Sequence, residues 1–132
     1  MGVISKEIAL QEVEKWLDYK KISESKKEAR TESIDALVEA ISDGYLVLND
    51  DFSFVQTLKF PTENEMSFKQ LTYKPRLKIS TIHSHLQGVK ASDGDSRICA
   101  YVAALTSLPK DLIKALDTED YSIAQGIAIF FL

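Results

Sequence analysis

The feature that most constrains the fold is a change in hydrophobic period after Gly44. Up to that glycine, apolar residues recur at helical spacing, whereas short β-branched and aromatic runs fill the stretch from Tyr45 to Tyr73. Beyond Pro75 the helical spacing returns. This order predicts an α+β fold in which helices dominate, with an N-terminal helical hairpin, a small antiparallel β-meander and a C-terminal helical bundle.

Two helices are expected within the first 44 residues. Ser5 can cap a first helix over 5–19, and Gly44 supplies the left-handed conformation that commonly follows a helix end, here that of a second helix over 25–42. The link at 20–24 is short, which favours an antiparallel pair. The apolar residues expected on the inner faces of the two helices are Ile4, Ile8, Val13, Trp16, Leu17, Ile34, Leu37, Val38 and Ile41.

Three strands and four helices are expected after Gly44. The strands span 45–49, 52–60 and 67–73, and the first two are joined by the turn residues Asn49-Asp50-Asp51. The helices are expected at 76–87, from Asp93 or Asp95 to Leu108, in a short segment beginning at Pro109, and at 121–132 after the cap sequence 117–120.

The length of 132 residues is typical of a single folded unit, to which a short module can be appended. We therefore expect residues 45–132 to form the main domain and residues 1–44 an appended helical module. Cys99 is the one cysteine, so no internal disulfide can form, which is typical of a reducing compartment such as the cytoplasm. No apolar run of 18 residues and no signal-peptide pattern is visible, so no membrane contact is expected.

Charge is unevenly distributed along the chain. The 16 Lys and Arg residues and 20 Asp and Glu residues give a net charge of −4, which argues against a protein that coats nucleic acid. Two basic clusters nevertheless occur, at 20–30 and in the acid-free segment 66–92, which also carries Phe68 and Tyr73. Basic residues interleaved with aromatics can hold phosphates and stack bases, so nucleic-acid binding is the second interpretation. The basic residues concerned are Lys20, Lys21, Lys26, Lys27, Arg30, Lys69, Lys74, Arg76, Lys78 and Lys90.

No recognisable catalytic or metal-binding pattern is present. His83 and His85 would point about 200° apart on a helix, so they cannot share a metal ion. The stretch 92–96 resembles a calcium loop but lacks its ligand series, and a helix cap explains it. Phosphate-binding glycine loops and nucleophile elbows are absent from the sequence. We therefore expect no catalytic residues, no metal and no cofactor, in a protein that is not an enzyme.

The C-terminal residues form a dense apolar run. Ile127 to Leu132 contains more apolar surface than one helix face can bury against a small core. Some of it is expected to pack inside, and an exposed remainder would be a surface for a partner or a second copy. The candidate partner-binding residues are Ile127, Phe130, Phe131 and Leu132.

Short elements of the C-terminal part recur in one known family. Leu105-Thr106-Ser107-Leu108-Pro109, then Leu116-Asp117 and Asp120-Tyr121, resembles the tail assembly chaperone family of contractile-tailed phages and Mu-like prophages. The similarity covers about Phe54–Leu132, including 58–61 and 71–76. The family commonly has glycine where Ser107 stands and a Gly-Asp after the basic-proline segment, which is absent here; residues 1–44 lie outside the resemblance.

The resemblance implies a non-enzymatic protein of the bacterial host cytoplasm. Such proteins bind the long helical tape measure protein, keep it soluble and help to recruit tail tube subunits. Many weak contacts along one helix act through effective concentration, so we also expect a homo-oligomer or multi-copy binding. Two alternatives stay open: a small phage-encoded nucleic-acid-binding or regulatory protein that uses the basic clusters at 20–30 and 66–92, and a structural component of the tail.

Overall fold

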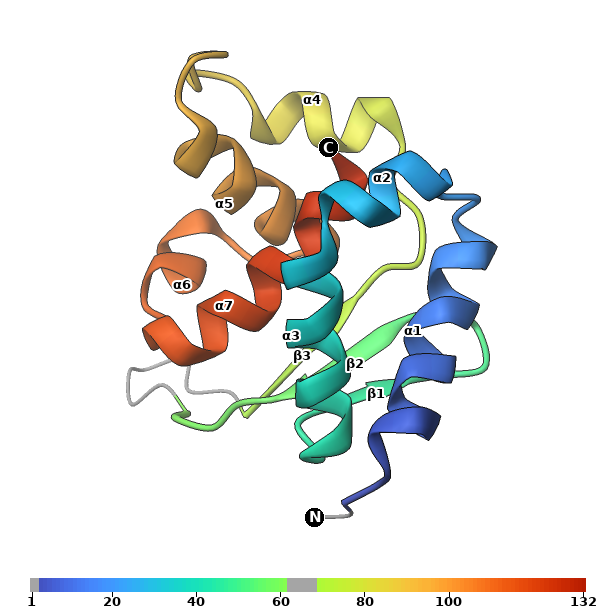
Figure 1. The fold of residues 1–132 in the computed structure, drawn as a ribbon. Helices are drawn as coiled ribbons and strands as arrows, with labels where there is room; N and C mark the ends of the chain where they lie inside the picture. The colour runs from blue at the N-terminus through green and yellow to red at the C-terminus, as the bar shows by residue number, and fades with distance from the viewer. Residues whose placement is uncertain (1–2, 62–68) are drawn as a thin grey trace.

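The computed structural model describes residues 3–61 and 69–132, and it has the helix-dominated α+β fold that the sequence predicts (Figure 1). The elements, in chain order, are α1 (Lys6–Tyr19), α2 (Glu24–Ala29), α3 (Thr31–Ser42), β1 (Leu46–Leu48), β2 (Phe54–Thr57), β3 (Gln70–Tyr73), α4 (Ile79–His85), α5 (Gly94–Thr106), α6 (Lys110–Lys114), α7 (Thr118–Ala128) and the 3-10 turn η1 (Ile129–Phe131).

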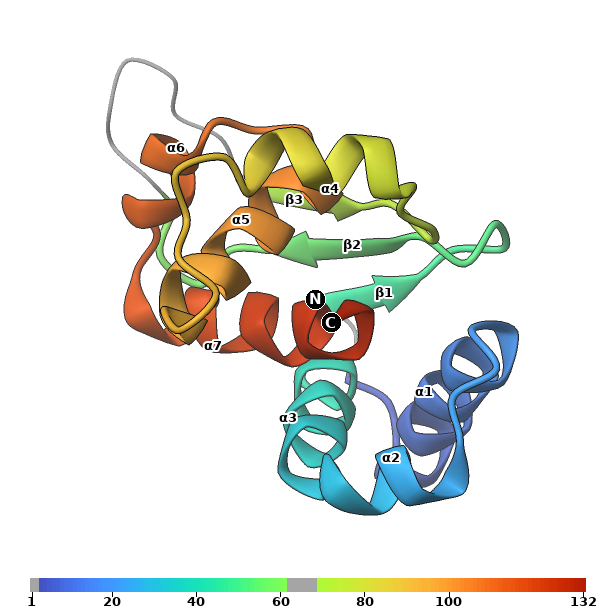
Figure 2. The same cartoon turned by 90° about the horizontal axis from the view of Figure 1, so that it is seen from above.

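The three strands form an antiparallel meander in the order β1-β2-β3. Val47 pairs with Val55 in the first ladder, and Val55 pairs with Thr72 in the second. Figures 1 and 2 show α1 and α3 side by side and antiparallel, with α7 next to α3 and the sheet beyond them. The helical hairpin and the meander are therefore confirmed.

One hydrophobic core joins the N-terminal helices to the rest of the chain. Trp16 of α1 lies at its centre, with its ring centroid 4.9 Å from that of Phe54 in β2 and 5.7 Å from that of Phe130 in η1. At the end of α1, Tyr19 stacks on Phe52 at 4.2 Å. Whether residues 1–44 are a separate module stays a prediction, but their apolar faces pack into the same hydrophobic cluster as the remainder.

The expected helix over 25–42 is wrong in one respect, because it is two helices. Arg30 leaves the helical conformation, with φ −118° and ψ 29°, and separates α2 from α3. Thr31 contributes to the break, since its hydroxyl donates a 2.9 Å hydrogen bond to the carbonyl of Glu28, a local alternative to the helical ladder. Figure 2 shows α2 bridging the ends of α1 and α3.

The buried face of α1 also differs from the expectation. Ser5 caps the helix by accepting a hydrogen bond from the amide of Ile8, as predicted. Ala9 is buried in the place expected for Ile8, which is 50% exposed, and Ile4 lies before the helix and is exposed. The small Ala9 therefore takes the buried position, and the larger Ile8 remains at the surface of α1.

The C-terminal helices follow the predicted order with different ends. Asp93, not Asp95, caps α5, which ends at Ser107 in a left-handed conformation with φ 58°. Asp117 caps α7, which therefore begins three residues before the predicted start at Tyr121. The predicted strands are longer than the observed ones, and the start of the third expected strand, together with Phe68, lies outside the described residues.

Candidate functional site

The C-terminal run is divided between the core and the surface. Ile127 and Phe130 are buried, so the expectation that they contact a partner is not supported by their positions. Phe131 is half-buried, and Leu132 is 39% exposed. These last two residues remain the accessible part of the candidate patch.

The structure brings members of the two basic clusters together beside the C-terminal turn. The Nζ of Lys20 lies 3.3 Å from the centroid of the Phe131 ring, and the Nζ of Lys26 donates a 3.2 Å hydrogen bond to the backbone oxygen of Leu132. Burial, and then the charges of Arg76 and Lys26, lower the pKa of Lys20 to about 8. We call Lys20, Lys26 and Arg76 the basic corner.

Lys27, from the same cluster, is neutralised locally. Its Nζ lies 3.3 Å from a carboxylate oxygen of Asp18 and 3.4 Å from one of Glu24. The hydrogen bond to Asp18 is the main cause that raises the pKa of Lys27 above its ordinary value. This lysine belongs to the acidic rim of a groove and not to the basic corner.

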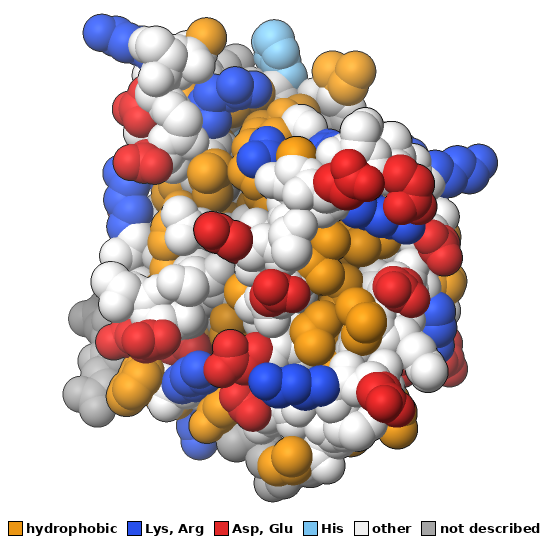
Figure 3. Space-filling model, viewed as in Figure 1, with side chains coloured by type: hydrophobic (Ala, Val, Ile, Leu, Met, Phe, Trp, Pro, Cys, Tyr) orange, Lys and Arg blue, Asp and Glu red, His pale blue; other side chains and the backbone are white. Residues whose placement is uncertain are grey.

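A groove of mixed polar and apolar character lies between α1 and α3, with α2 at one end. Its volume is about 450 Å³, and its apolar lining comes from Leu10, Leu17 and Ile34. Figure 3 shows hydrophobic side chains at the surface between these two helices, with Asp and Glu side chains around them. The lining carries three carboxylates, those of Glu14, Asp18 and Glu24, against the single ammonium of Lys27. We call this feature the α1–α3 groove.

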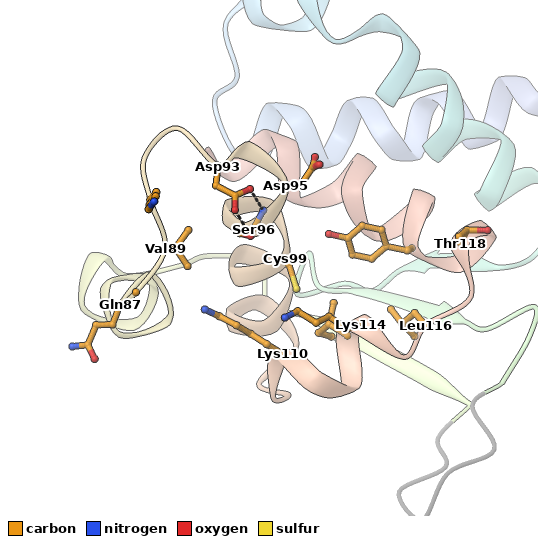
Figure 4. Close-up of a pocket in the computed structure, with 14 residues that line it drawn as sticks. Gln87, Val89, Asp93, Asp95, Ser96, Cys99, Lys110, Lys114, Leu116 and Thr118 are labelled. Atoms are coloured by element: carbon orange, nitrogen blue, oxygen red, sulfur yellow. Dashed lines mark hydrogen bonds between the residues drawn. The ribbon is translucent and has the colours of Figure 1, made fainter.

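A second concavity, of about 740 Å³, lies between α5, α6, the start of α7 and the loop 87–90 (Figure 4). We call it the lysine cleft, because three lysines line it: Lys90 from the loop, and Lys110 and Lys114 from successive turns of α6. In Figure 4 the ammonium ends of Lys110 and Lys114 point the same way, toward the side of the cleft formed by the loop. The sequence gives a weak signal for this pair, which is its i, i+4 spacing on one helix.

The acids of the lysine cleft are used within the protein or stand apart from the lysines. Asp93 caps α5, with its carboxylate oxygens accepting hydrogen bonds from the amide of Ser96 at 3.1 Å and from its hydroxyl at 2.7 Å. These bonds lower the pKa of Asp93. In the part of the chain that the structure describes, no carboxylate lies within 4 Å of the Nζ of Lys90, Lys110 or Lys114.

The inner wall of the lysine cleft is less polar than its rim. Cys99 and Tyr121 line it together with Ile113 and Leu116. Burial raises the pKa of the Cys99 thiol, although Lys114 and Lys110 oppose the shift, and burial raises the pKa of Tyr121 to about 12. Both groups are therefore neutral near pH 7.

A buried polar network anchors the start of α7 to β2. The carboxylate of Asp120 accepts hydrogen bonds from the backbone amides of Lys59 at 2.8 Å and Phe60 at 3.0 Å. The side-chain amide of Gln56 donates to the carbonyl of Asp120 at 3.0 Å, and its oxygen accepts from the Tyr73 hydroxyl at 2.5 Å. Burial raises the pKa of Tyr73. The network is internally paired, so its role is structural.

Both histidines lie in α4. His83 is exposed, and the Nδ1 of His85 lies 2.9 Å from the carbonyl oxygen of Thr81 in its own helix. Over residues 3–61 and 69–132, no three side chains of His, Cys, Asp or Glu gather where a metal ion could bind. Within these same ranges, no helix combines the length and the apolar character that crossing a bilayer requires.

Compared with protein-family models, with curated proteins and with solved structures, the chain matches none of them. The function therefore has to be argued from the residues and their geometry.

Proposed function

We propose that the protein is a phage or prophage tail assembly chaperone. In this role it is not an enzyme: it binds the helical tape measure protein, keeps its apolar face covered and helps to recruit tail tube subunits. It acts in the cytoplasm of the bacterial host and in several copies.

The α1–α3 groove is the observation that supports this proposal best. An amphipathic helix can lay its apolar face against exposed apolar side chains in a groove, and Leu10, 40% exposed, is such a side chain within the charged rim of this one. The acidic rim favours a helix whose apolar face is bordered by lysine or arginine. Residues 1–44, which lie outside the family resemblance, then have a role as the partner-docking module.

The residues that carry the resemblance support the proposal in a different way. Ser107 occupies a left-handed position, which is a conformation that favours the glycine common in the family. Asp117 caps α7 and Asp120 anchors it to β2. These roles are structural, so this part of the resemblance argues for a shared fold, and the partner surface rests on the groove.

The proposal is tested by mixing the protein with helical fragments of the tape measure protein encoded in the same genome. Size-exclusion chromatography with light scattering then gives the mass of the complex and the number of copies bound. We expect a complex whose copy number grows with fragment length, because weak sites on one helix act through effective concentration. A strict monomer that ignores every fragment would contradict the proposal.

Two matched variants locate the surface. Leu10→Asp places a charge in the α1–α3 groove and is expected to abolish the complex. Ile79→Asp makes the same kind of change at a residue that is 82% exposed and lies outside the groove, and it is expected to bind normally. Equal loss of binding in both variants would contradict docking of the helix in the α1–α3 groove.

The basic corner favours a second candidate, a small nucleic-acid-binding or regulatory protein. Lys20 and Lys26 come from the cluster at 20–30 and Arg76 from the segment 66–92, and the structure places them near one another. A group of cations with an aromatic ring beside it can contact a phosphate backbone and a base.

A gel shift with labelled DNA and RNA at physiological salt tests this candidate. The double variant Lys26→Gln/Arg76→Gln is compared with Lys110→Gln/Lys114→Gln, which removes the same charge from the lysine cleft. Binding that survives physiological salt and is lost only in the first variant would favour nucleic acid. Binding that vanishes as salt rises, or falls equally in both variants, would reject it.

A further inference from the structure

We propose that the lysine cleft binds a small organic anion that carries an apolar body. This inference goes beyond the proposed function, since it concerns a different surface and a different class of ligand. The cleft lies between α5, α6 and α7, whereas the groove proposed for the tape measure helix lies between α1 and α3.

The size of the lysine cleft fits a small molecule. Its volume of about 740 Å³ lies within the roughly 300–1,000 Å³ typical of ligand pockets. Its walls come from three helices and a loop, so a ligand inside would be enclosed from several sides. Val89 and the ring of Tyr121, both half-buried, offer an apolar contact surface in its lining, and the buried residues Cys99, Ile113 and Leu116 lie at its base.

The charge on the lysine cleft fits an anion. Lys110 and Lys114 are one helical turn apart, and their ammonium ends point the same way (Figure 4). Two neighbouring cations repel each other, and within the described chain no carboxylate is close enough to pair with either. A phosphate, carboxylate or sulfonate placed between them and Lys90 would remove this repulsion and accept hydrogen bonds from the ammonium groups.

The acids of the lysine cleft do not cancel this preference. Both oxygens of Asp93 already accept hydrogen bonds from Ser96, and Asp95 lies in the first turn of α5, where a helix dipole stabilises it. The polar hydroxyl of Tyr121 stays protonated and can donate a hydrogen bond to an anion. The lining therefore combines three cations and two carboxylates, a formal excess of one positive charge, with one neutral donor and an apolar wall.

A pair of fluorescent dyes tests the inference. The probe 8-anilinonaphthalene-1-sulfonate is a small aromatic anion, and N-phenyl-1-naphthylamine is a similar aromatic molecule without the charge. Titration of the folded chain with each dye gives two dissociation constants, and inorganic phosphate is added as a competitor. Amide chemical shifts then locate the dye by comparing residues 87–99 and 110–121 with the rest of the chain.

We expect the sulfonate dye to bind in the lysine cleft, to bind more tightly than the neutral dye, and to be displaced by phosphate. In Lys110→Gln/Lys114→Gln its affinity is expected to fall at least about tenfold, because the charge-assisted contacts of both lysines are lost. The neutral dye should be affected much less. The variant Lys26→Gln/Arg76→Gln carries the same change in net charge elsewhere and should bind both dyes as the parent chain does.

Three results would overturn the inference: no saturable binding of the sulfonate dye, equal loss in both double variants, or shift changes confined to residues outside the lysine cleft. Circular dichroism of each variant excludes the trivial case in which the dye binds an unfolded chain. None of these results bears on the complex with the tape measure helix, so the two proposals can fail separately.

Discussion

The ammonium nitrogen of Lys20 lies 3.3 Å from the centroid of the Phe131 ring. This contact joins the residue that follows α1 to the C-terminal turn η1. The same ammonium is partly buried beside Lys26 and Arg76, and its pKa falls to about 8 for these reasons. A cation in such a place costs stability while it stays charged.

Lys20 should therefore make the free energy of unfolding rise with pH in alkaline solution. Below about pH 8 it is protonated in both states; between about 8 and the ordinary value of 10.5 the unfolded chain holds the proton more tightly, so stability increases as pH rises. Urea unfolding at pH 7 and pH 10 should show a gain over Lys20→Met of about 1 kcal/mol, after a discount for solvent screening of a partly exposed ammonium. The comparison with Lys20→Met removes contributions that are common to both proteins. An equal change of unfolding free energy with pH in both proteins would contradict a lowered pKa for Lys20.

Replacing Asp120 should weaken the junction between α7 and β2. Asp120→Ala leaves the amides of Lys59 and Phe60 without their acceptor, and we expect a loss of about 3 kcal/mol because hydrogen bonds to a charged group are involved. The neighbouring acid Glu119 is exposed, so Glu119→Ala should cost about 0.5 kcal/mol. Urea unfolding followed by circular dichroism compares the two variants. Similar losses of unfolding free energy would contradict a role for Asp120 in anchoring α7.

The C-terminal run should separate into a core residue and a surface residue. Phe130→Ala removes a buried ring and is expected to cost about 3–5 kcal/mol. Leu132→Ala should change stability by about 0.5 kcal/mol or less, since the side chain is exposed. Thermal melts of both variants check this, and a stable Phe130→Ala chain would show that the ring is not part of the core.

Gly126 should tolerate a methyl group. A Cβ at this position would lie 3.4 Å from Leu37 Cδ2, an ordinary contact, and glycine inside a helix is unfavourable. We expect Gly126→Ala to stabilise the chain by up to about 1 kcal/mol. The larger Gly126→Val should instead destabilise it, because α3 and α7 pack closely there. Denaturant midpoints of the two variants should therefore move in opposite directions.

Cys99 should react slowly with thiol reagents. Burial raises its pKa and covers the sulfur, which is in a residue only 7% exposed, so little thiolate is available. Reaction with an aromatic disulfide at pH 8 is expected to be at least about tenfold slower than in denaturant, because burial both disfavours the thiolate and blocks access to the sulfur. Equal rates would mean that the α5–α6 contact opens freely.

Local chemistry explains which parts of the fold were predictable. Ser5, Gly44 and Asp117 act within a few residues of their own positions, and their roles as helix caps or helix ends follow from sequence alone. The break at Arg30 could not be predicted from the sequence, because helical periodicity continues on both sides of it. The burial of Ala9 in place of Ile8 was not predictable either, because hydrophobic spacing favours the larger residue and tertiary packing decides which face is covered.

The candidate sites depended even more on tertiary structure. Lys20 and Arg76 are distant in sequence, and the fold brings their charges close enough to interact. Lys90 and Lys110 likewise line one cleft whose walls belong to separate elements. The apolar C-terminal run was visible from composition, but its division into buried Phe130 and exposed Leu132 required the fold.

The position of Trp16 gives the molecule a built-in optical reporter. It is the one tryptophan of the chain, and its ring meets Phe54 of strand β2 and Phe130 and Phe131 of the C-terminal turn η1. Its fluorescence emission therefore reports whether α1 is packed against β2 and η1. A red shift that precedes the loss of helical circular dichroism would reveal residues 1–44 detaching as a unit, and coincident signals would reveal one cooperative structure.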